Sequence, residues 1–251
     1  GDIVAYLAAR DDCDYQWLMD TNWRSSAAMI TGYNRLFYGN TKPTILCEGK
    51  TDNVYLKTAV NMLVGSYPRL ASKAVNPKTT KTDYDLLVRF LEYSKRTKFL
   101  LQLSGGTPYL NYFIIKFNSQ CAFYKAPKPQ HPVIIVLDND SGFTDEIKGK
   151  LSAKTPATAY PISLKKKDFR NADFIHMLRN LYVVLTPLST AGNDTDIEEL
   201  FDSATRSTIV SGKTFNPKDD RDNDKEYGKE IFAKKVIQAQ KKTINFDGLK
   251  P

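Results

Sequence analysis

The sequence is short of cysteine and histidine, the residues that most often hold zinc. Its three cysteines, Cys13, Cys47 and Cys121, lie far apart, so neither a zinc spacing nor a disulfide framework is present. We expect all three to be reduced, and Cys47, which lies in an apolar run, to be buried. His131 stands at a strand start and His176 in an amphipathic stretch, so neither is a candidate for catalysis.

Long hydrophobic runs and low-complexity tracts are missing too. No run approaches 18 consecutive apolar residues, and the first residues carry neither a basic segment nor a cleavage site for secretion. We therefore expect a cytoplasmic protein without membrane association. Apolar residues make up 41% and charged residues 25% of the 251 residues, which is typical of a globular protein. The start at Gly1 rather than Met suggests a portion of a longer polypeptide.

The net charge is +8, and the isoelectric point is about 9.2. Such a charge favours polyanionic partners such as nucleic acid, because lysine and arginine neutralise phosphates and release counterions. A merely basic, well-solvated surface gives the same number. The charge therefore supports a nucleic-acid function only beside a site that acts on phosphates.

The chain divides into a helical arm over residues 1–42 and one domain over residues 43–251. The arm contains two helix-like stretches, 14–20 and 25–39. Its aromatic residues are predicted to pack on the domain in preference to stacking on bases. They are Trp17, Trp23, Tyr33, Phe37 and Tyr38.

Within the domain, apolar β-rich runs alternate with helical periodicity. Strands are predicted at 44–47, 98–106, 133–137 and 181–188. Helices are predicted at 52–64, 84–93, 107–118, 143–151 and 226–242. A helical insertion then covers about 66–97 and a C-terminal helical extension about 195–251. This alternation predicts an α/β fold with a mainly parallel sheet of about four strands flanked by helices.

Acidic residues follow two of these strands directly. Glu48 comes one residue after the run TILC with Asp52 four residues on, and Asp138 and Asp140 follow VIIVL. Ligands in open parallel sheets bind at the carboxyl ends of strands, and neighbouring strands lie about 5 Å apart. Carboxylates gathered so closely need a cation, and Mg²⁺ prefers their oxygens. We expect one or two Mg²⁺ ions, with Mn²⁺ as an alternative.

Together the segments ILCEGKTD and IIVLDNDSG resemble the Toprim domain, a Rossmann-like fold found in topoisomerases, bacterial primases, OLD-family nucleases and small ribosomal RNA maturases. The resemblance covers about residues 43–200 and includes Gly105-Gly106. It implies that Glu48 transfers a proton beside the metal and that Asp52, Asp138 and Asp140 organise the ions. In nuclease-type members a further acid completes a second metal site. Glu198 or Glu199 would supply it here, although acids in DIEELFD also suit a helix start.

A narrower resemblance concerns residues 35–60, RLFYGNTKPTILCEGKTDNVYLKTAV. They are similar to the junction at which some retron reverse transcriptases continue into a Toprim extension. The likeness implies a retron reverse transcriptase and its msDNA as partners. No YxDD motif of a polymerase occurs in this chain.

Several functions compete for this acidic site. A topoisomerase needs a tyrosine nucleophile from a further domain, and a primase needs a zinc module that three scattered cysteines do not supply. The favoured hypothesis is a metal-dependent nuclease, the effector of a retron antiphage system; the alternative is a catalytically silent module that binds nucleic acid or its retron partner. The sequence does not choose between DNA and RNA, and a homo-oligomer is compatible with either hypothesis.

Basic side chains are expected to contact the substrate phosphates. Lys50, inside the first acidic motif, is the foremost candidate and is predicted to act beside Glu48 in catalysis. Lys165, Lys166, Lys167 and Arg170 are predicted to bind nucleic acid, against the alternative that this cluster is a solvated face.

Overall fold

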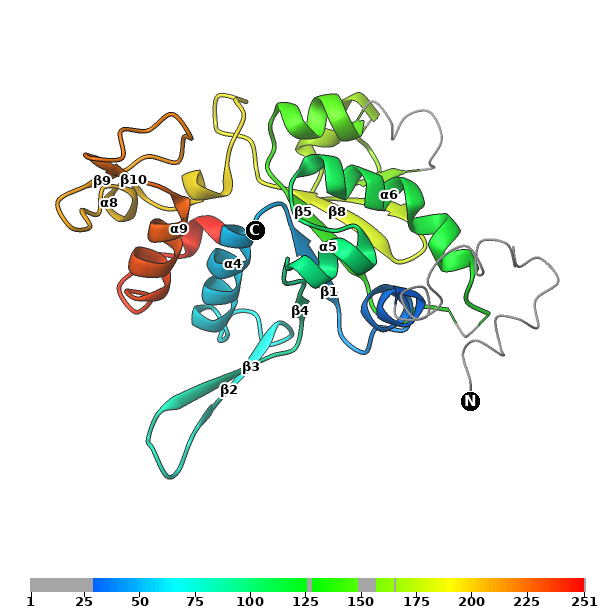
Figure 1. Cartoon of the computed structure of the whole chain (residues 1–251), viewed down its shortest axis with the longest axis horizontal. Helices are drawn as coiled ribbons and strands as arrows, with labels where there is room; N and C mark the ends of the chain where they lie inside the picture. The colour runs from blue at the N-terminus through cyan, green and yellow to red at the C-terminus, as the bar shows by residue number, and fades with distance from the viewer. Residues whose placement is uncertain (1–28, 126–127, 149–156, 165, 251) are drawn as a thin grey trace.

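The computed structural model describes residues 29–125, 128–148, 157–164 and 166–250. The chain has an α/β fold in which helices flank a mixed six-stranded sheet (Figure 1). The strands of this sheet are β1 (Thr44–Cys47), β4 (Arg89–Phe90), β5 (Val133–Leu137), β6 (Thr158–Tyr160), β7 (Phe174–Leu178) and β8 (Leu181–Leu185). Two separate pairs are β2 (Ala71–Val75) with β3 (Thr82–Leu86) and β9 (Thr214–Phe215) with β10 (Glu226–Tyr227).

The helices include short 3₁₀ and π-helical segments. They are η1 (Asn34–Tyr38), α4 (Lys50–Met62), α5 (Lys95–Leu101), α6 (Thr107–Ala122), η2 (Gly142–Lys148), η3 (Lys166–Asn171), η4 (Ile197–Leu200), α8 (Ser203–Arg206), α9 (Lys229–Ile231), η5 (Phe232–Gln238) and η6 (Asp247–Leu249). No helix in the described part of the chain is long and apolar enough to cross a membrane.

The strand order places the two acidic motifs side by side. The sheet runs β4-β1-β5-β8-β7-β6, with parallel pairing from β4 to β8 and antiparallel pairing of β7 with β8 and β6. In register, Thr44 pairs with Val133 and Cys47 with Val136. The carboxyl ends of β1 and β5 therefore meet at one edge of the sheet, as expected from the sequence.

The main core lies between one face of the sheet and the helices η1, α6 and η2. Alternate strand residues such as Ile135 and Val183 are fully buried there against Phe117 of α6. The arm joins this core, because Phe37 is 0% exposed and Tyr33 and Tyr38 are each 5% exposed. Packing of these three aromatics is thus confirmed, whereas Trp17 and Trp23 lie outside the described residues.

Helix α4 packs on the other face of β1 and carries the C-terminal segment on its far side. Cys47 is buried there with Phe90 of β4, as predicted for this cysteine. Beyond α4, Tyr55 packs against Phe201 and Phe232 in a second core. The C-terminal lobe, residues 195–250, is therefore anchored to the helix that begins directly after Glu48 (Figure 1).

The helix predicted at 84–93 is wrong. The insertion predicted to be helical at 66–97 is mostly non-helical, because a helix begins there only at Lys95. Residues 71–86 form the hairpin β2–β3, which projects from the body (Figure 1). Its turn is held by the Asn76 side chain, which accepts hydrogen bonds from the N–H groups of Lys78 and Thr79. Past the hairpin, the N–H of Leu91 bonds to the carbonyl of Ile45 and extends the sheet edge. Pairing with β1 therefore overrode the helical spacing of Leu86, Leu87, Phe90 and Leu91.

The strand predicted at 98–106 is also wrong, because residues 95–101 form α5. The Ser94 side chain accepts a hydrogen bond from the N–H of Thr97, which caps the helix, and Gln102 ends it in the left-handed conformation. Phe99 is 72% exposed, so the apolar run is not a buried strand. The serine and threonine three residues apart were the local signal that favoured a helix.

The sheet is larger than predicted, because β4, β6 and β7 were not recognised. Each has only two to five residues, too few for a clear alternating pattern. The other predicted elements at 44–47, 52–64, 107–118, 133–137 and 181–188 exist with small shifts of their ends. The helix predicted at 226–242 begins at Lys229, after the short pair β9–β10, so the C-terminal extension is not wholly helical. Helix η2 covers the first part of 143–151, and residues 149–151 lie outside the described residues.

Candidate functional site

Glu48 lies at the carboxyl end of β1 and accepts hydrogen bonds from two other segments, the start of α6 and the end of β5. Its Oε1 accepts a hydrogen bond of 2.6 Å from the Thr107 hydroxyl, and its Oε2 accepts one of 3.3 Å from the N–H of Asp138. Burial raises the pKa of Glu48 above its ordinary value, and Asp140 and Asp52 raise it further against these two hydrogen bonds. A half-buried carboxyl with a raised pKa suits proton transfer near neutral pH.

The position of Glu48 depends on the turn before α6. The N–H of Gly106 donates to the Glu48 carbonyl over 2.7 Å, and Gly105 has φ +82°. A Cβ on Gly105 would come within 2.9 Å of that same carbonyl oxygen. Glycine is therefore required there for two reasons, since the left-handed conformation also disfavours a side chain. The contact of Thr107 with Glu48 was not foreseen from the sequence.

Asp138 follows β5 and faces the C-terminal lobe. Its Oδ1 accepts a hydrogen bond of 2.9 Å from the N–H of Ile197, at the start of η4. Burial raises the pKa of Asp138 to about 8, with the nearby charges of Asp52 and Glu48 as the next causes. Asp196 and Glu198 contribute to the same rise. Acids from two segments of the sequence, both distant from Asp138, thus act on its carboxyl group.

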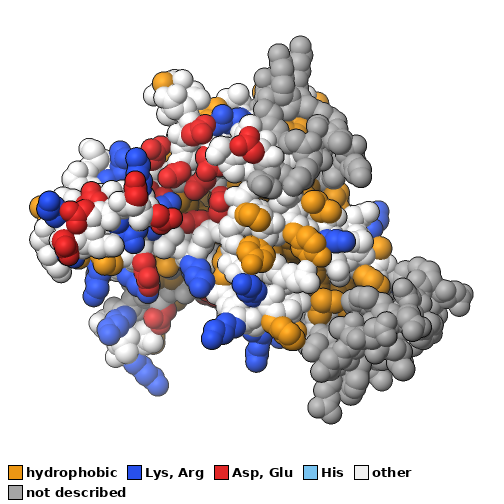
Figure 2. Space-filling view, turned by 45° about the horizontal axis from the view of Figure 1, so that its top comes forward, with side chains coloured by type: hydrophobic (Ala, Val, Ile, Leu, Met, Phe, Trp, Pro, Cys, Tyr) orange, Lys and Arg blue, Asp and Glu red, His pale blue; other side chains and the backbone are white. Residues whose placement is uncertain are grey.

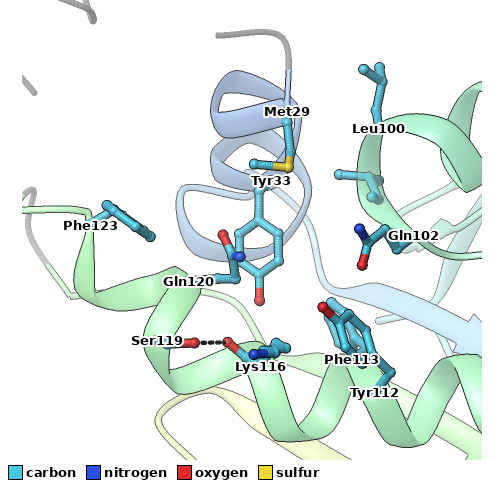
Figure 3. Close-up of a pocket in the computed structure, with 11 residues that line it drawn as sticks. Met29, Tyr33, Leu100, Gln102, Tyr112, Phe113, Lys116, Ser119, Gln120 and Phe123 are labelled. Atoms are coloured by element: carbon cyan, nitrogen blue, oxygen red, sulfur yellow. Dashed lines mark hydrogen bonds between the residues drawn. The ribbon is translucent and has the colours of Figure 1, made fainter. Parts of the chain in front are cut away.

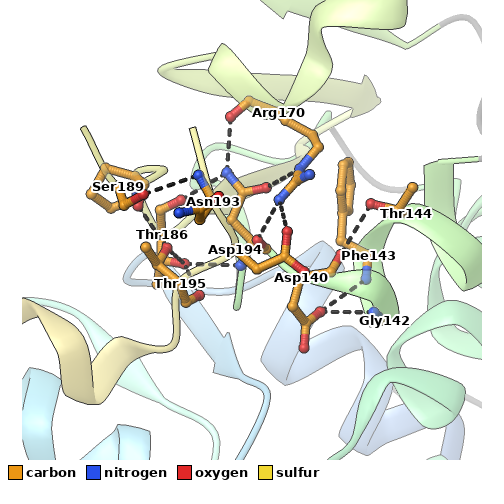
Figure 4. Close-up of polar contacts among 12 residues, drawn as sticks. Asp140, Gly142, Phe143, Thr144, Arg170, Thr186, Ser189, Asn193, Asp194 and Thr195 are labelled. Carbon is orange, nitrogen blue, oxygen red and sulfur yellow. Dashed lines mark hydrogen bonds and ion pairs between the residues drawn. The ribbon is translucent and has the colours of Figure 1, made fainter. Parts of the chain in front are cut away.

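Asn139 holds the second motif in place between its two aspartates. It is fully buried, and its side-chain amide donates to the carbonyls of Arg170 and Thr186, each over 2.9 Å. The Arg170 guanidinium donates to the side chain and the carbonyl of Asn139, and also to Asp194 over 2.6 Å (Figure 4). The structure therefore places Arg170 as a support of the acidic motif, where a phosphate contact was predicted.

Asp140 turns toward the start of η2. Its Oδ1 accepts hydrogen bonds from the N–H groups of Gly142 at 2.8 Å and Phe143 at 3.4 Å (Figure 4). A Cβ on Gly142 would come within 2.9 Å of the Thr107 hydroxyl. The close approach of η2 to Thr107, and through it to Glu48, therefore depends on this glycine.

Asp52 lies in the first turn of α4 and is buried. Its Oδ2 accepts a hydrogen bond of 2.7 Å from the N–H of Gly49, and Thr51 donates to its Oδ1 over 3.2 Å. Asp52 thus caps the helix. Its charge still reaches the site, because it raises the pKa values of both Glu48 and Asp138.

The two glutamates of DIEELFD differ in their surroundings. Glu198 is buried, forms an ion pair of 3.0 Å with Lys229, and accepts a hydrogen bond from the Tyr55 hydroxyl. Glu199 is exposed. The acid that sequence reasoning missed is Asp196, which acts on the pKa of Asp138 and lies 4.0 Å from Lys229. Its position as the first acid of the DIEELFD segment was the available signal.

Of the lysines predicted to contact phosphates, only Lys50 has a described side chain. Lys50 is exposed at the start of α4, and its charge acts on Glu230 in α9. Residues 166–171 form η3, while Lys165 lies outside the described residues, as do the side chains of Lys166 and Lys167. Figure 2 shows acidic side chains gathered where the C-terminal lobe meets the sheet, with lysine and arginine toward the edges of this face.

The donors at these strand ends fit Mg²⁺ chemically. They are carboxylate oxygens. Burial and, after it, their mutual repulsion raise the pKa of Asp138, and a divalent cation relieves that repulsion. Among the described residues, no group of three or more histidine, cysteine, aspartate or glutamate side chains is arranged to hold a metal ion by itself. Mg²⁺ commonly binds through one or two carboxylates together with waters and substrate phosphates, so such a protein cage is not required.

A pocket elsewhere on the molecule has a different character. It has a volume of about 380 Å³ and lies between the helix of residues 29–33, α5 and α6 (Figure 3). Its residues on α6 run from Tyr112 to Gln120, with Phe123 just past the end of the helix, whereas Glu48 contacts Thr107, the first residue of α6. Mostly apolar and at the other end of α6, this pocket is no candidate for phosphate chemistry.

No family model matches this chain, and no solved structure matches it.

Proposed function

We propose that the chain is a Toprim-type, metal-dependent nuclease that hydrolyses phosphodiester bonds of nucleic acid. The observation that carries the proposal is the hydrogen bond of 3.3 Å from the N–H of Asp138 to Glu48, because it joins the two acidic motifs. Asp138 and Asp140 are the proposed metal ligands, with Asp52 and Glu198 as further acids around them. Bound Mg²⁺ would supply charge neutralisation at the scissile phosphate and a more acidic water.

In this proposal Glu48 moves the proton. Its raised pKa, due mainly to burial, suits a group that accepts and returns a proton at neutral pH. Thr107 and the N–H of Asp138 orient its carboxylate from two sides, so the group has a defined direction. Lys50, exposed at the start of α4 two residues after Glu48, is the proposed contact for a substrate phosphate.

We also propose that the nuclease is the effector of a retron antiphage system and works with a reverse transcriptase and its msDNA. Support comes from the similarity of residues 35–60 to the junction in such enzymes. These residues form η1, β1 and the start of α4, a continuous part of the folded domain. In this proposal the junction with the reverse transcriptase is therefore part of the same folded domain as Glu48.

The alternative is a catalytically silent module that binds nucleic acid or its retron partner. One observation favours it: the described acids, as placed, do not converge as three metal ligands. It also agrees with the binding of Asp52, Asp138 and Asp140 by backbone N–H groups.

The deciding experiment incubates the protein with plasmid DNA, single-stranded DNA and total RNA in the presence of Mg²⁺ or Mn²⁺. Glu48→Gln keeps the size of the side chain and one accepting oxygen, but it replaces the other carboxylate oxygen with an amide nitrogen that cannot take up the proton. We expect cleavage by the wild type and a loss of at least about a hundredfold in the variant. Cleavage that persists in Glu48→Gln refutes the proposed site. Binding without cleavage by the wild type, freed from its retron partners, supports the silent module.

A further inference from the structure

One face of the sheet is only partly covered in the described structure. Strands β5, β8, β7 and β6 direct alternate side chains to the face opposite the main core. These side chains are half-buried or exposed, and they belong to none of the hydrophobic clusters that the described residues form. They are Ile134, Val136, Tyr160, Phe174, His176, Tyr182 and Val184, here called the open face.

Aromatic rings dominate the outer half of the open face. Tyr160 and Phe174 are cross-strand partners with stacked rings, 4.6 Å between centroids and 15° between planes. Tyr182 packs edge-on to Phe174 at 6.2 Å and lies 4.9 Å from the His176 ring. Phe174 remains 36% exposed. A group of rings that is ordered by its neighbours and still open to solvent marks an interaction surface and suits stacking of bases.

Two grooves lie along this face and share Asp173 and Val184. One has a volume of about 540 Å³ and extends from Pro129 at the amino end of β5. The other has a volume of about 950 Å³ and reaches Ile197 at the carboxyl ends of the strands. Because the N–H of Ile197 binds Asp138, this second groove ends beside the candidate site.

The lining of the grooves favours an anion. Among the described lining residues, Arg170, Arg179 and Lys250 carry positive charge and Asp173 carries negative charge. Arg170 is already paired with Asp194, and Lys250 with Asp247. A strand of five residues is about 16 Å long. That length matches roughly four or five nucleotides at the 3.4 Å spacing of one strand of B-DNA.

We propose that the open face binds single-stranded nucleic acid and leads it to the acids around Glu48. Bases stack on Tyr160, Phe174 and Tyr182, and the phosphates follow the cationic groove toward Ile197. A duplex presents no free base faces, so it binds this surface more weakly. Cleavage of the bound nucleic acid rests on the proposed function, whereas binding to the open face does not depend on catalysis.

The test measures binding by fluorescence anisotropy with labelled 12-nucleotide strands of DNA and RNA and with a hairpin duplex. Measurement in EDTA keeps binding separate from cleavage. We expect Phe174→Ala and Tyr160→Ala each to weaken single-strand binding about tenfold, and Phe174→Tyr to preserve it. Phe99→Ala is the matched control, because Phe99 is exposed on α5, outside the groove. Circular dichroism establishes that each variant is folded.

The outcomes separate this inference from the proposed function. Glu48→Gln is expected to bind single strands like the wild type. If the wild type binds single strands through Phe174 but cleaves nothing, the nuclease proposal fails. The open face is then still a binding surface for single-stranded nucleic acid. Equal binding by Phe174→Ala and the wild type overturns the inference, as does a preference for the duplex. The inference is also refuted if Phe174→Ala only converts a dimer to a monomer, because the face is then a protein interface.

Discussion

The N–H of Asp138 donates to Oε2 of Glu48 over 3.3 Å, although the two residues are 90 positions apart in the sequence. The contact exists because β1 and β5 are parallel neighbours in register. The carboxyl groups at the two strand ends are therefore close together and partly buried. Burial raises the pKa values of both Glu48 and Asp138, and nearby carboxylates raise them further.

The metal-free protein is expected to lose stability as the pH rises from about 4 to about 8. Asp138 has an ordinary pKa of 3.8 and a pKa of about 8 in the fold. Between these values the folded chain binds more protons than the unfolded chain, so ionisation favours unfolding. Urea unfolding in EDTA across this range measures the effect. Asp138→Asn, which cannot ionise, is expected to give a flatter profile.

Mg²⁺ is expected to counteract this loss. It binds the ionised carboxylates, so it should raise Tm more at pH 8 than at pH 5. The exposed Asp219 serves as the control position, since Asp219→Asn leaves both the pH profile and the Mg²⁺ response unchanged. An equal Mg²⁺ effect in the wild type and in Asp138→Asn contradicts the assignment of Asp138 as a ligand.

Gly105→Ala is expected to destabilise the fold and disturb Glu48. The residue has φ +82°, and the new Cβ would lie 2.9 Å from the Glu48 carbonyl. The left-handed conformation alone costs about 1–2 kcal/mol for an L-residue, and the contact adds to it. Urea unfolding and the cleavage assay measure the two effects. Gly65→Ala is the matched control, because its Cβ meets nothing within 4 Å. Similar behaviour of the two variants contradicts this account of the turn.

Lys229→Met is expected to lower stability by about 2 kcal/mol at neutral pH. The substitution leaves the Glu198 carboxylate, whose side chain is 2% exposed, without its cation. The half-exposed ammonium of Lys229 keeps the cost below that of a fully buried pair. Lys234→Met removes a comparable ion pair from the surface and should cost less than about 1 kcal/mol.

A double substitution tests the cause of that loss. Glu198→Gln removes the buried charge, so Lys229→Met should cost less in its presence than alone. The free energy of unfolding is measured for all four proteins of this cycle. If the two costs simply add, the ion pair does not account for the loss.

Removal of the β2–β3 hairpin is expected to leave the domain folded. Apart from Ala71, both strands are exposed or half-buried along their length, so the hairpin contributes little to the core. Ala71 and Leu86 are cross-strand partners, and an Asn-Gly turn in place of residues 72–85 can join them. Thermal unfolding should stay cooperative, with a Tm within a few degrees of the wild type. A shift of more than ten degrees would show that the hairpin supports the fold.

The strongest periodic patterns gave correct elements from the sequence. The apolar runs that end at Cys47 and Leu137 are buried strands, and the helices after Glu48 and Gly106 begin close to where the pattern places them. An unbroken apolar, β-rich run and a full helical period leave marks in the sequence itself, although Ile134 and Val136 of β5 are only half-buried. These marks were enough to locate the acids at the strand ends and to predict the α/β class.

Other parts of the fold and the site depend on tertiary contacts. Residues 89–90 form a strand because β1 offers a free edge, and Thr107 reaches Glu48 because the Gly105–Gly106 turn brings α6 to that edge. The pairing of Glu198 with Lys229 and the approach of Asp196 to Asp138 arise from packing of the C-terminal lobe on α4. The sequence thus determined which acids follow which strands. Only the tertiary structure decided their neighbours, because burial and charge at a carboxyl group come from segments far away along the chain.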